Sequence, residues 1–195
     1  MPPRIAAIIL AAGRATRMGG ANKLIAEIGG RALVRRVAEA ALASAARPVL
    51  AVTGARAGEV EAVLAGLQLT FVANPDYATG LASSLKAGIR ALPPESDGAL
   101  ILLGDMPLIE AAHLDRLIGA FAADAIIVPT HRGERGNPVL WPRAYFSELL
   151  QLDGDAGAKR LLCVHAAEVR EIDLASDAIF ADVDTPEALE ELRKQ

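Results

Sequence analysis

The sequence contains only one cysteine, Cys163, so no disulfide can form within the chain. Sparse cysteine use of this kind is typical of a reducing compartment, and we therefore expect a cytoplasmic protein. Cys163 lies in the apolar run RLLCVHAA. A free cysteine in such surroundings usually behaves as a small hydrophobic side chain, so the run predicts a buried structural thiol.

The sequence also contains no long apolar run and no excess of positive charge. No run approaches the roughly 18 apolar residues that a membrane span requires, so no membrane partner is expected. The apolar run 5–12 is at the short limit for a secretory leader, and the basic residues Arg14 and Arg17 follow at once. The net charge of −4 argues against a broad nucleic-acid-binding surface, so no nucleic acid is expected either.

Apolar segments suited to strands alternate with segments suited to amphipathic helices. Hydrophobic residues make up 52% of the chain and charged residues 23%, which favours a packed globule over disorder. Continuous apolar runs predict strands buried on both faces, and a 3.6-residue apolar period predicts the helices between them. The predicted strands are 5–10, 47–54, 69–75, 98–105, 125–130, 136–141 and 167–173; the predicted helices are 31–45, 60–67, 80–92, 111–121, 145–152, 155–165 and one that begins at Pro186 with Thr185 as its N-cap.

This alternation predicts an α/β protein, a three-layer Rossmann-like fold with a mostly parallel central sheet. No repeat or linker interrupts the chain, so we expect a single domain over residues 1–195. Ligands of open parallel sheets bind at the carboxyl ends of the strands, and the polar segments AAGRATR, NPDYATG and GDMP all fall there.

The glycine-rich basic loop LAAGRATRMGGANK follows the first predicted strand. Glycines let the backbone approach an anion and direct N–H groups at it, and Arg17 and Lys23 can neutralise phosphate oxygens. The loop is neither a GxxxxGK[ST] nor a GxGxxG motif. A basic structural turn is the alternative, but a phosphate cradle is the interpretation we favour.

Three aspartates are candidate ligands for a metal ion. Asp105 ends the most apolar strand, in LLGDMPLI, where it suits Mg²⁺ held beside a triphosphate; the alternative is a helix cap. Asp182 and Asp184, in DVDTPEAL, would point to one face if this segment were a strand, although Asp184 could equally be only a neighbour of the Thr185 cap. The three histidines have no metal-ligand spacing, and no Ser-His-Asp arrangement is evident.

The loop resembles the signature LAAGx[ST]xRMGxxK of nucleotidyltransferases that transfer a nucleoside monophosphate from a triphosphate. Ala15 departs from that pattern, and Asn22 adds one residue ahead of Lys23. GDMP, RGNPVLW and LDGDAGAKRLL resemble the molybdopterin nucleotidyltransferase branch, whose fold is of the nucleotide-diphospho-sugar transferase type. LAAG in place of LAGG at residues 10–13 resembles the cytidylyl members rather than the guanylyl members.

The resemblance implies a nucleotide-binding half over about 1–107 and an acceptor-binding half over about 108–195. It implies Arg17, Lys23 and Asp105 as catalytic residues and Mg²⁺ on Asp105 and Asp184. NPDYATGLASSLKAG resembles the segment that holds base and ribose, although simple capping of a helix would also explain Ser83 and Ser84. The implied nucleotide-binding residues are Leu10, Ala11, Ala12, Gly13, Arg17, Lys23, Gly80, Ser84 and Asp105, and the implied acceptor-binding residues are Arg135, Gly136, Asn137, Pro138 and Asp155.

The activity implied is transfer of CMP from CTP to the terminal phosphate of a molybdopterin-type phosphomonoester, with release of pyrophosphate. Such an acceptor is already largely ionised near neutral pH, since the second pKa of a phosphomonoester is about 6, so no general base is required. Two alternatives stay open at this point. One is a guanylyl-transferring or sugar- or alcohol-phosphate nucleotidyltransferase, and the other is a cofactor-binding escort for a molybdoenzyme partner.

Overall fold

The first strand explains why the chain folds in layers. The computed structural model describes residues 2–13, 22–154 and 158–194, and in it β1 (Ile5–Ala11) is buried along its whole length. Its side chains alternate between two cores: Ile5 and Ile9 face one, whereas Ile8 and Leu10 face the other. A strand that is apolar on both faces must be covered on both, so helices are required on each side of the sheet.

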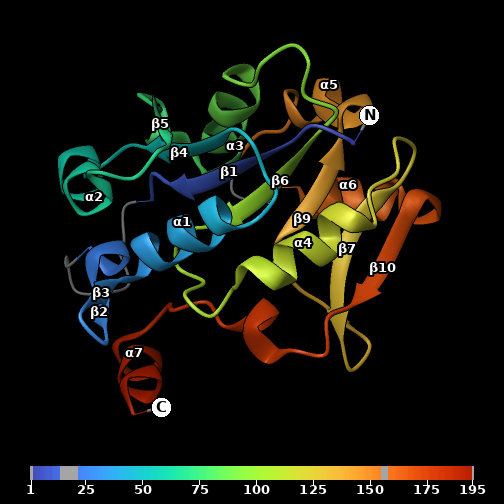
Figure 1. Cartoon of the computed structure of the whole chain (residues 1–195). Helices are drawn as coiled ribbons and strands as arrows, with labels where there is room; N and C mark the ends of the chain where they lie inside the picture. Colours follow the sequence, from blue (N-terminus) through green and yellow to red (C-terminus); the bar gives the residue numbers. More distant parts are fainter. Residues whose placement is uncertain (1, 14–21, 155–157, 195) are drawn as a thin grey trace.

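β1 lies near the middle of a mixed sheet in which most strands are parallel (Figure 1). The strand order is β10-β7-β9-β6-β1-β4-β5, with β8 paired to β7. Among the described strands of this sheet, β8 and β9 run antiparallel to their neighbours. The other strands are β4 (Val49–Thr53), β5 (Thr70–Ala73), β6 (Gly98–Leu103), β7 (Ile126–His131), β8 (Glu134–Arg135), β9 (Val139–Pro142) and β10 (Val169–Asp173).

Helices cover both faces of this sheet, α1 and α4 in front and α3 behind in Figure 1. One core is completed by α1 (Leu33–Ala43), α2 (Ala57–Leu64) and α4 (Ala111–Gly119), and the other by α3 (Leu81–Arg90), α5 (Phe146–Leu149) and α6 (Lys159–Val164). The predicted three-layer α/β fold with a mostly parallel sheet is confirmed. Short 3-10 turns connect these elements: η2 (Lys23–Ile25), η3 (Tyr77–Thr79), η4 (Arg143–Tyr145), η5 (Ala166–Glu168) and η6 (Asp177–Phe180).

A small third core joins the C-terminal helix to a hairpin. The hairpin is formed by β2 (Glu27–Ile28) and β3 (Arg31–Ala32), and α7 (Pro186–Arg193) lies beside it (Figure 1). The predicted start of α7 is confirmed, because the Thr185 hydroxyl accepts a hydrogen bond from the Ala188 N–H. Val183, fully buried, and Leu189 pack with Ile28 and Leu33. The C-terminal segment is therefore held against the part of the chain that follows Lys23.

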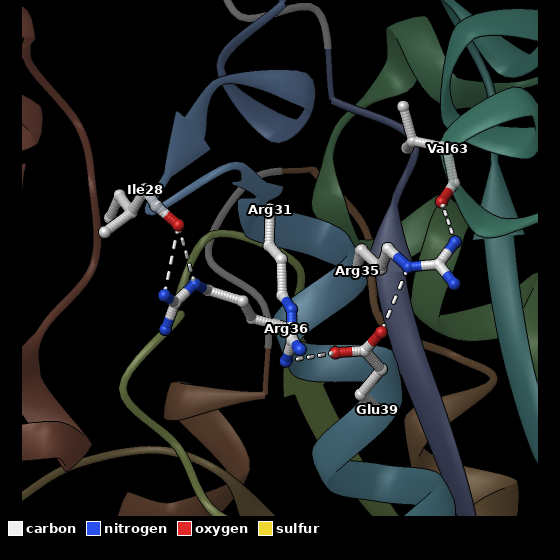
Figure 2. A network of polar contacts seen from close by, with 6 residues as sticks. All are labelled: Ile28, Arg31, Arg35, Arg36, Glu39 and Val63. Atoms are coloured by element: carbon white, nitrogen blue, oxygen red, sulfur yellow. Dashed lines mark hydrogen bonds and ion pairs between the residues drawn. The ribbon is translucent and has the colours of Figure 1, made fainter.

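Two arginines of α1, Arg35 and Arg36, donate hydrogen bonds to neighbouring elements (Figure 2). Arg35 donates to the carbonyl oxygen of Val63, 2.7 Å away, at the carboxyl end of α2, where a positive charge also complements the helix dipole. Arg36 donates to the carbonyl oxygen of Ile28 at 3.0 Å. Arg31 and Arg35 both pair with Glu39. The hairpin and α2 are thus anchored to the same helix.

Two expectations from the sequence are wrong. Cys163 is exposed rather than buried, because α6 is short and turns Leu161 toward the core; a residue two positions later lies on the opposite side of a helix. Residues 181–184 form no strand, so the predicted alternation of Asp182 and Asp184 does not apply to them. In the described part of the chain, no helix has the length and apolar character needed to cross a membrane.

Close packing of α3 on the sheet generates a stability prediction. Gly88 is buried, and a Cβ added to it would lie 2.5 Å from Ile8 Cγ2 and 3.2 Å from Val52 Cγ2. Where space is available, replacing a helical glycine with alanine stabilises the protein by about 1 kcal/mol. Overpacking a core destabilises it by roughly 1–3 kcal/mol. We expect Gly88→Ala to lower the free energy of unfolding in a urea titration by about 1 kcal/mol.

Gly58→Ala is the matched control, because Gly58 is also helical, lies in α2, and has nothing within 4 Å of its added Cβ. It should leave stability unchanged or raise it by up to about 1 kcal/mol. Equal stabilisation by the two substitutions would show that α3 does not pack on β1 and β4 this closely.

Candidate active site

The turns that follow three central strands meet at the carboxyl edge of the sheet. β1 pairs in parallel with β4 and β6, so their carboxyl ends lie side by side. The Gly104 N–H, just beyond β6, donates to the carbonyl oxygen of Leu10 at 3.1 Å, and the Ala55 N–H, just beyond β4, donates to that of Ala12 at 3.4 Å. This edge is where a parallel sheet binds its ligands.

At this edge one lysine bridges two aspartates from distant parts of the chain. The ammonium Nζ of Lys23 lies 2.5 Å from Oδ2 of Asp105 and 2.6 Å from Oδ1 of Asp184. The Lys23 and Asp105 side chains are 18% and 16% exposed, and that of Asp184 is 42% exposed. We call these three residues the Lys23 cluster. One cation therefore engages both carboxylates at once.

Backbone contacts hold the two aspartates beside each other. Asp105 follows β6, and its carbonyl oxygen accepts a hydrogen bond from the Val183 N–H at 3.0 Å. Val183 is fully buried in the small third core, which fixes the next residue, Asp184, at the sheet edge. The irregular backbone of 181–184 therefore directs Asp184 toward the site, as a strand was expected to do. Asp182 is exposed.

Lys23 is positioned from the side of α2. Asn22, only 5% exposed, accepts a hydrogen bond from the Leu24 N–H and so caps the turn η2. Its amide nitrogen donates to Oε2 of Glu59 at 3.2 Å, and Glu59 also pairs with Arg56. The sequence interpretation treated Asn22 only as an added residue. The signal available was an asparagine directly before the expected catalytic lysine, a common capping residue.

Electrostatics keep the Lys23 ammonium charged. Burial, the largest single effect, lowers the pKa of Lys23, but the Asp105 and Asp184 carboxylates together outweigh burial and raise the pKa above 10.5. The second carboxylate oxygen of Asp105, Oδ1, is buried and has no hydrogen-bond partner among the described residues. An oxygen of this kind, close to a second carboxylate, fits a hard divalent cation, which prefers oxygen ligands. The cluster therefore has the donor set for a metal ion.

The predicted nucleotide-binding residues lie along the same edge. Leu10, Ala11 and Ala12 are buried at and just after the end of β1, and Gly13 follows them in an exposed position. Gly54 brings this turn close to the segment before α3, since a Cβ on Gly54 would lie 2.8 Å from the Cβ atoms of both Ala12 and Tyr77. The sequence interpretation missed Gly54, although a glycine directly after a buried strand was the signal.

Gly80 and Ser84 are placed by the start of α3. Gly80 has φ +114°, a conformation that favours glycine, and precedes the first residue of the helix. Ser84 is buried in the first turns of α3 and accepts a hydrogen bond from the amide of Asn74. Gly80, the N-cap residue of this helix, makes no side-chain capping hydrogen bond, and the Ser83 hydroxyl donates to the Gly80 carbonyl oxygen at 2.8 Å.

The predicted acceptor-binding residues form a separate segment after β7. Arg135 pairs with Glu171 at 2.7 Å. Gly136 passes so close to η6 that an added Cβ would lie 2.5 Å from the Ile179 carbonyl oxygen, and that oxygen accepts from the Asn137 N–H at 3.0 Å. Pro138 is buried. This segment therefore rests on the part of the chain that leads to Asp184.

In the residues that the structure describes, no hydrogen bond or ion pair joins this acceptor segment to the Lys23 cluster. Two further predicted site residues, Arg17 and Asp155, lie outside the described residues. The structure thus brings Lys23, Asp105 and Asp184 into direct contact, and the acceptor segment rests on Ile179, which precedes Asp184 in the chain.

Comparison with known proteins identifies the class to which this sheet and its charged cluster belong. Residues 7–169 match the model of the MobA-like NTP transferase domain. Because this match covers most of the chain, the protein belongs to the family of MobA-like NTP transferase domains.

The chain is similar to curated relatives of at least three kinds. The chain is 29% identical to the molybdenum cofactor cytidylyltransferase of Escherichia coli over 92% of this chain and 91% of the relative. It is 29% identical to the purine catabolism protein PucB of Bacillus subtilis over 98% and 97% of the two chains. The bifunctional protein GlmU of Anaeromyxobacter is 38% identical over 67% of this chain, which spans only 28% of the length of that relative.

Among solved structures, Rv0371c of Mycobacterium tuberculosis superposes with a TM-score of 0.91 at 27% identity, covering 100% of both chains. A manganese complex of the same protein superposes with a TM-score of 0.83 at 25% identity. These likenesses agree with the fold described above over its full length.

The Lys23 cluster predicts a cost for removing its cation. Lys23→Met keeps most of the aliphatic side chain but leaves Asp105 mostly buried without a positive partner. Loss of a partly buried charged hydrogen bond costs about 2 kcal/mol, so we expect the free energy of unfolding of the ligand-free protein to fall by about that amount.

Lys86→Met is the control, because Lys86 pairs with Asp153, whose side chain is 90% exposed. A surface pair of this kind contributes no more than about 1 kcal/mol. Equal effects of the two substitutions in chemical denaturation would contradict the strong pairing of Lys23.

Proposed function

We propose that this nucleotidyltransferase transfers CMP from CTP to the terminal phosphate of a molybdopterin-type phosphomonoester and releases pyrophosphate. The observation that carries the transferase part is the Lys23 cluster, in which a partly buried lysine and two carboxylates meet at the ligand-binding edge of the sheet. The choice of CTP and acceptor is supported by the nearly full-length likeness to a molybdenum cofactor cytidylyltransferase and by LAAG at residues 10–13.

The reaction needs positioning and charge neutralisation more than proton transfer. An oxygen of the acceptor phosphate attacks the α-phosphorus of CTP, and the bond from that phosphorus to the bridging oxygen of pyrophosphate breaks. The acceptor is largely dianionic because its second pKa is about 6, so it needs no base. Lys23 and Arg17 would neutralise the triphosphate, and the Gly13–Gly20 backbone would line it.

The metal part of the proposal concerns Asp105 and Asp184, which would hold Mg²⁺. The support is the unpartnered, buried Oδ1 of Asp105 and its closeness to Asp184. A bound divalent cation would supply further neutralisation of the phosphate charge. Arg135, Gly136, Asn137, Pro138 and Asp155 would bind the acceptor. The single-domain organisation with halves at about 1–107 and 108–195, the cytoplasmic setting and a molybdoenzyme partner stay predictions.

Pyrophosphate release from each of four nucleoside triphosphates, with molybdopterin, a sugar phosphate and an alcohol phosphate as acceptors, tests the proposal. We expect release only with CTP and the molybdopterin-type acceptor. Release with GTP, or with a sugar or alcohol phosphate, would identify a different nucleotidyltransferase. Tight binding of the molybdenum cofactor without any pyrophosphate release would identify an escort.

Asp105→Ala tests the metal assignment. Loss of one preorganised electrostatic contact lowers turnover by about 10²-fold or more, and we expect a decrease in kcat of at least about that size at saturating Mg²⁺. Asp182→Ala is the matched control, since Asp182 is an exposed carboxylate close in sequence to Asp184, and it should retain wild-type kcat. Wild-type turnover by Asp105→Ala would show that the metal is held elsewhere.

A further inference from the structure

A buried asparagine outside the Lys23 cluster, Asn74, contacts the two serines near the start of α3. Asn74 follows β5, is 4% exposed, and donates its backbone N–H to the Thr53 carbonyl oxygen at 2.8 Å. Its side chain reaches both serines of α3, Ser83 and Ser84. From the sequence, Asn74 is expected only to end a strand.

The orientation of the Asn74 amide follows from its partners. The Asp76 backbone N–H, which can only donate, lies 3.0 Å from Oδ1 of Asn74. The amide nitrogen Nδ2 must therefore face the two serines, 2.8 Å from Ser83 Oγ and 3.0 Å from Ser84 Oγ. An amide NH₂ group only donates, so both serine oxygens accept from Asn74.

The hydroxyl protons of Ser83 and Ser84 differ in their hydrogen-bond acceptors. Ser83 donates its proton to the Gly80 carbonyl oxygen at 2.8 Å. The Ser84 proton has no acceptor within hydrogen-bonding distance among the described residues, although Ser84 is only 5% exposed. A buried hydroxyl group normally satisfies its donor. Ser84 is thus prepared to donate to something that is not part of this described structure.

Helix geometry directs Ser84 toward the carboxyl edge of β1 and β4. Gly88 lies against Ile8 and Val52, and Ser84 is four residues earlier on the same face of α3. The helix begins at the edge where Gly80, Ala12 and Gly54 lie, since η3 contacts Gly54. Ser84 therefore lies one turn nearer than Gly88 to the edge at which a nucleotide would bind.

We propose that Asn74 is a positioning residue that makes Ser84 a hydrogen-bond donor, so that the base facing Ser84 must present an acceptor. The unprotonated ring nitrogen and the carbonyl oxygen of cytosine are such acceptors. This inference rests on the proposed function, because it assigns the base contact of the same nucleotide site. Asn74 thereby fixes the polarity of the base contact without touching the base.

Asn74→Asp replaces the amide donor that faces the two serines with a carboxylate acceptor of almost the same shape. A carboxylate accepts the protons of both serines, leaving Ser84 without a proton to donate to a base. Equilibrium binding of CTP and of ribose 5-triphosphate, which lacks a base, is measured for the wild-type protein and for Asn74→Asp, Ser84→Ala, Ser83→Ala and the double variant Asn74→Asp/Ser84→Ala. Thermal unfolding of each variant checks that it is folded.

We expect Asn74→Asp and Ser84→Ala each to weaken CTP binding by at least about 10-fold, the effect of one buried hydrogen bond, and to leave ribose 5-triphosphate binding unchanged. Ser83→Ala should bind CTP like the wild-type protein, because its proton is already used by Gly80. In the Ser84→Ala background, Asn74→Asp should have no further effect on CTP binding.

Three results would overturn the inference alone: wild-type CTP affinity in Asn74→Asp, an undiminished effect of Asn74→Asp once Ser84 is alanine, or equal losses for CTP and ribose 5-triphosphate. Binding of neither ligand by the wild-type protein would instead overturn the proposed function and the inference with it. The two failures are therefore distinguishable.

Discussion

The ion pairs of one ammonium group with two carboxylates are the constraint on which the site depends. Lys23, Asp105 and Asp184 come from the beginning, middle and end of the chain, and Nζ of Lys23 lies within 2.6 Å of both aspartates. Two carboxylates this close would repel each other without a cation between them. The ligand-free protein supplies that cation itself, and under the proposed function a divalent ion and the triphosphate would share the role.

The rest of the fold serves to hold these three groups in place. Parallel pairing of β1 with β6 brings the turn after each strand to one edge. The capped turn η2 presents Lys23, with Glu59 behind Asn22. On the other side, the buried Val183 and its hydrogen bond to the Asp105 carbonyl oxygen carry Asp184 to the same edge. Each charged group is thus supported by a buried or hydrogen-bonded neighbour.

Features with a local cause could be predicted from the sequence. The runs of residues 5–10 and 98–103 identify buried strands, and Thr185 with Pro186 identifies the start of α7. Asp105 was expected at the sheet edge because it directly follows an apolar strand. The meeting of Asp105 with Asp184 is expected from the family resemblance, whereas the strand expected to hold Asp182 and Asp184 is an irregular segment.

Features that depend on contacts between distant segments could not be predicted in the same way. The exposure of Cys163 depends on how little of α6 reaches the core, which an apolar run does not reveal. The burial of Asn22 and Asn74 depends on Glu59 and on the serines of α3. Asparagine is common in turns and at helix caps, so the sequence indicates at most a capping role for Asn22 and gives no reason to expect a buried, hydrogen-bonded role for Asn74.

The most direct test of the account is a crystal structure of the protein with CTP and Mn²⁺, in which anomalous scattering locates the metal. The account predicts Mn²⁺ bound to the carboxylates of Asp105 and Asp184, with the Lys23 ammonium on the triphosphate. A triphosphate bound away from this edge, with Lys23 still bridging both aspartates, would contradict it.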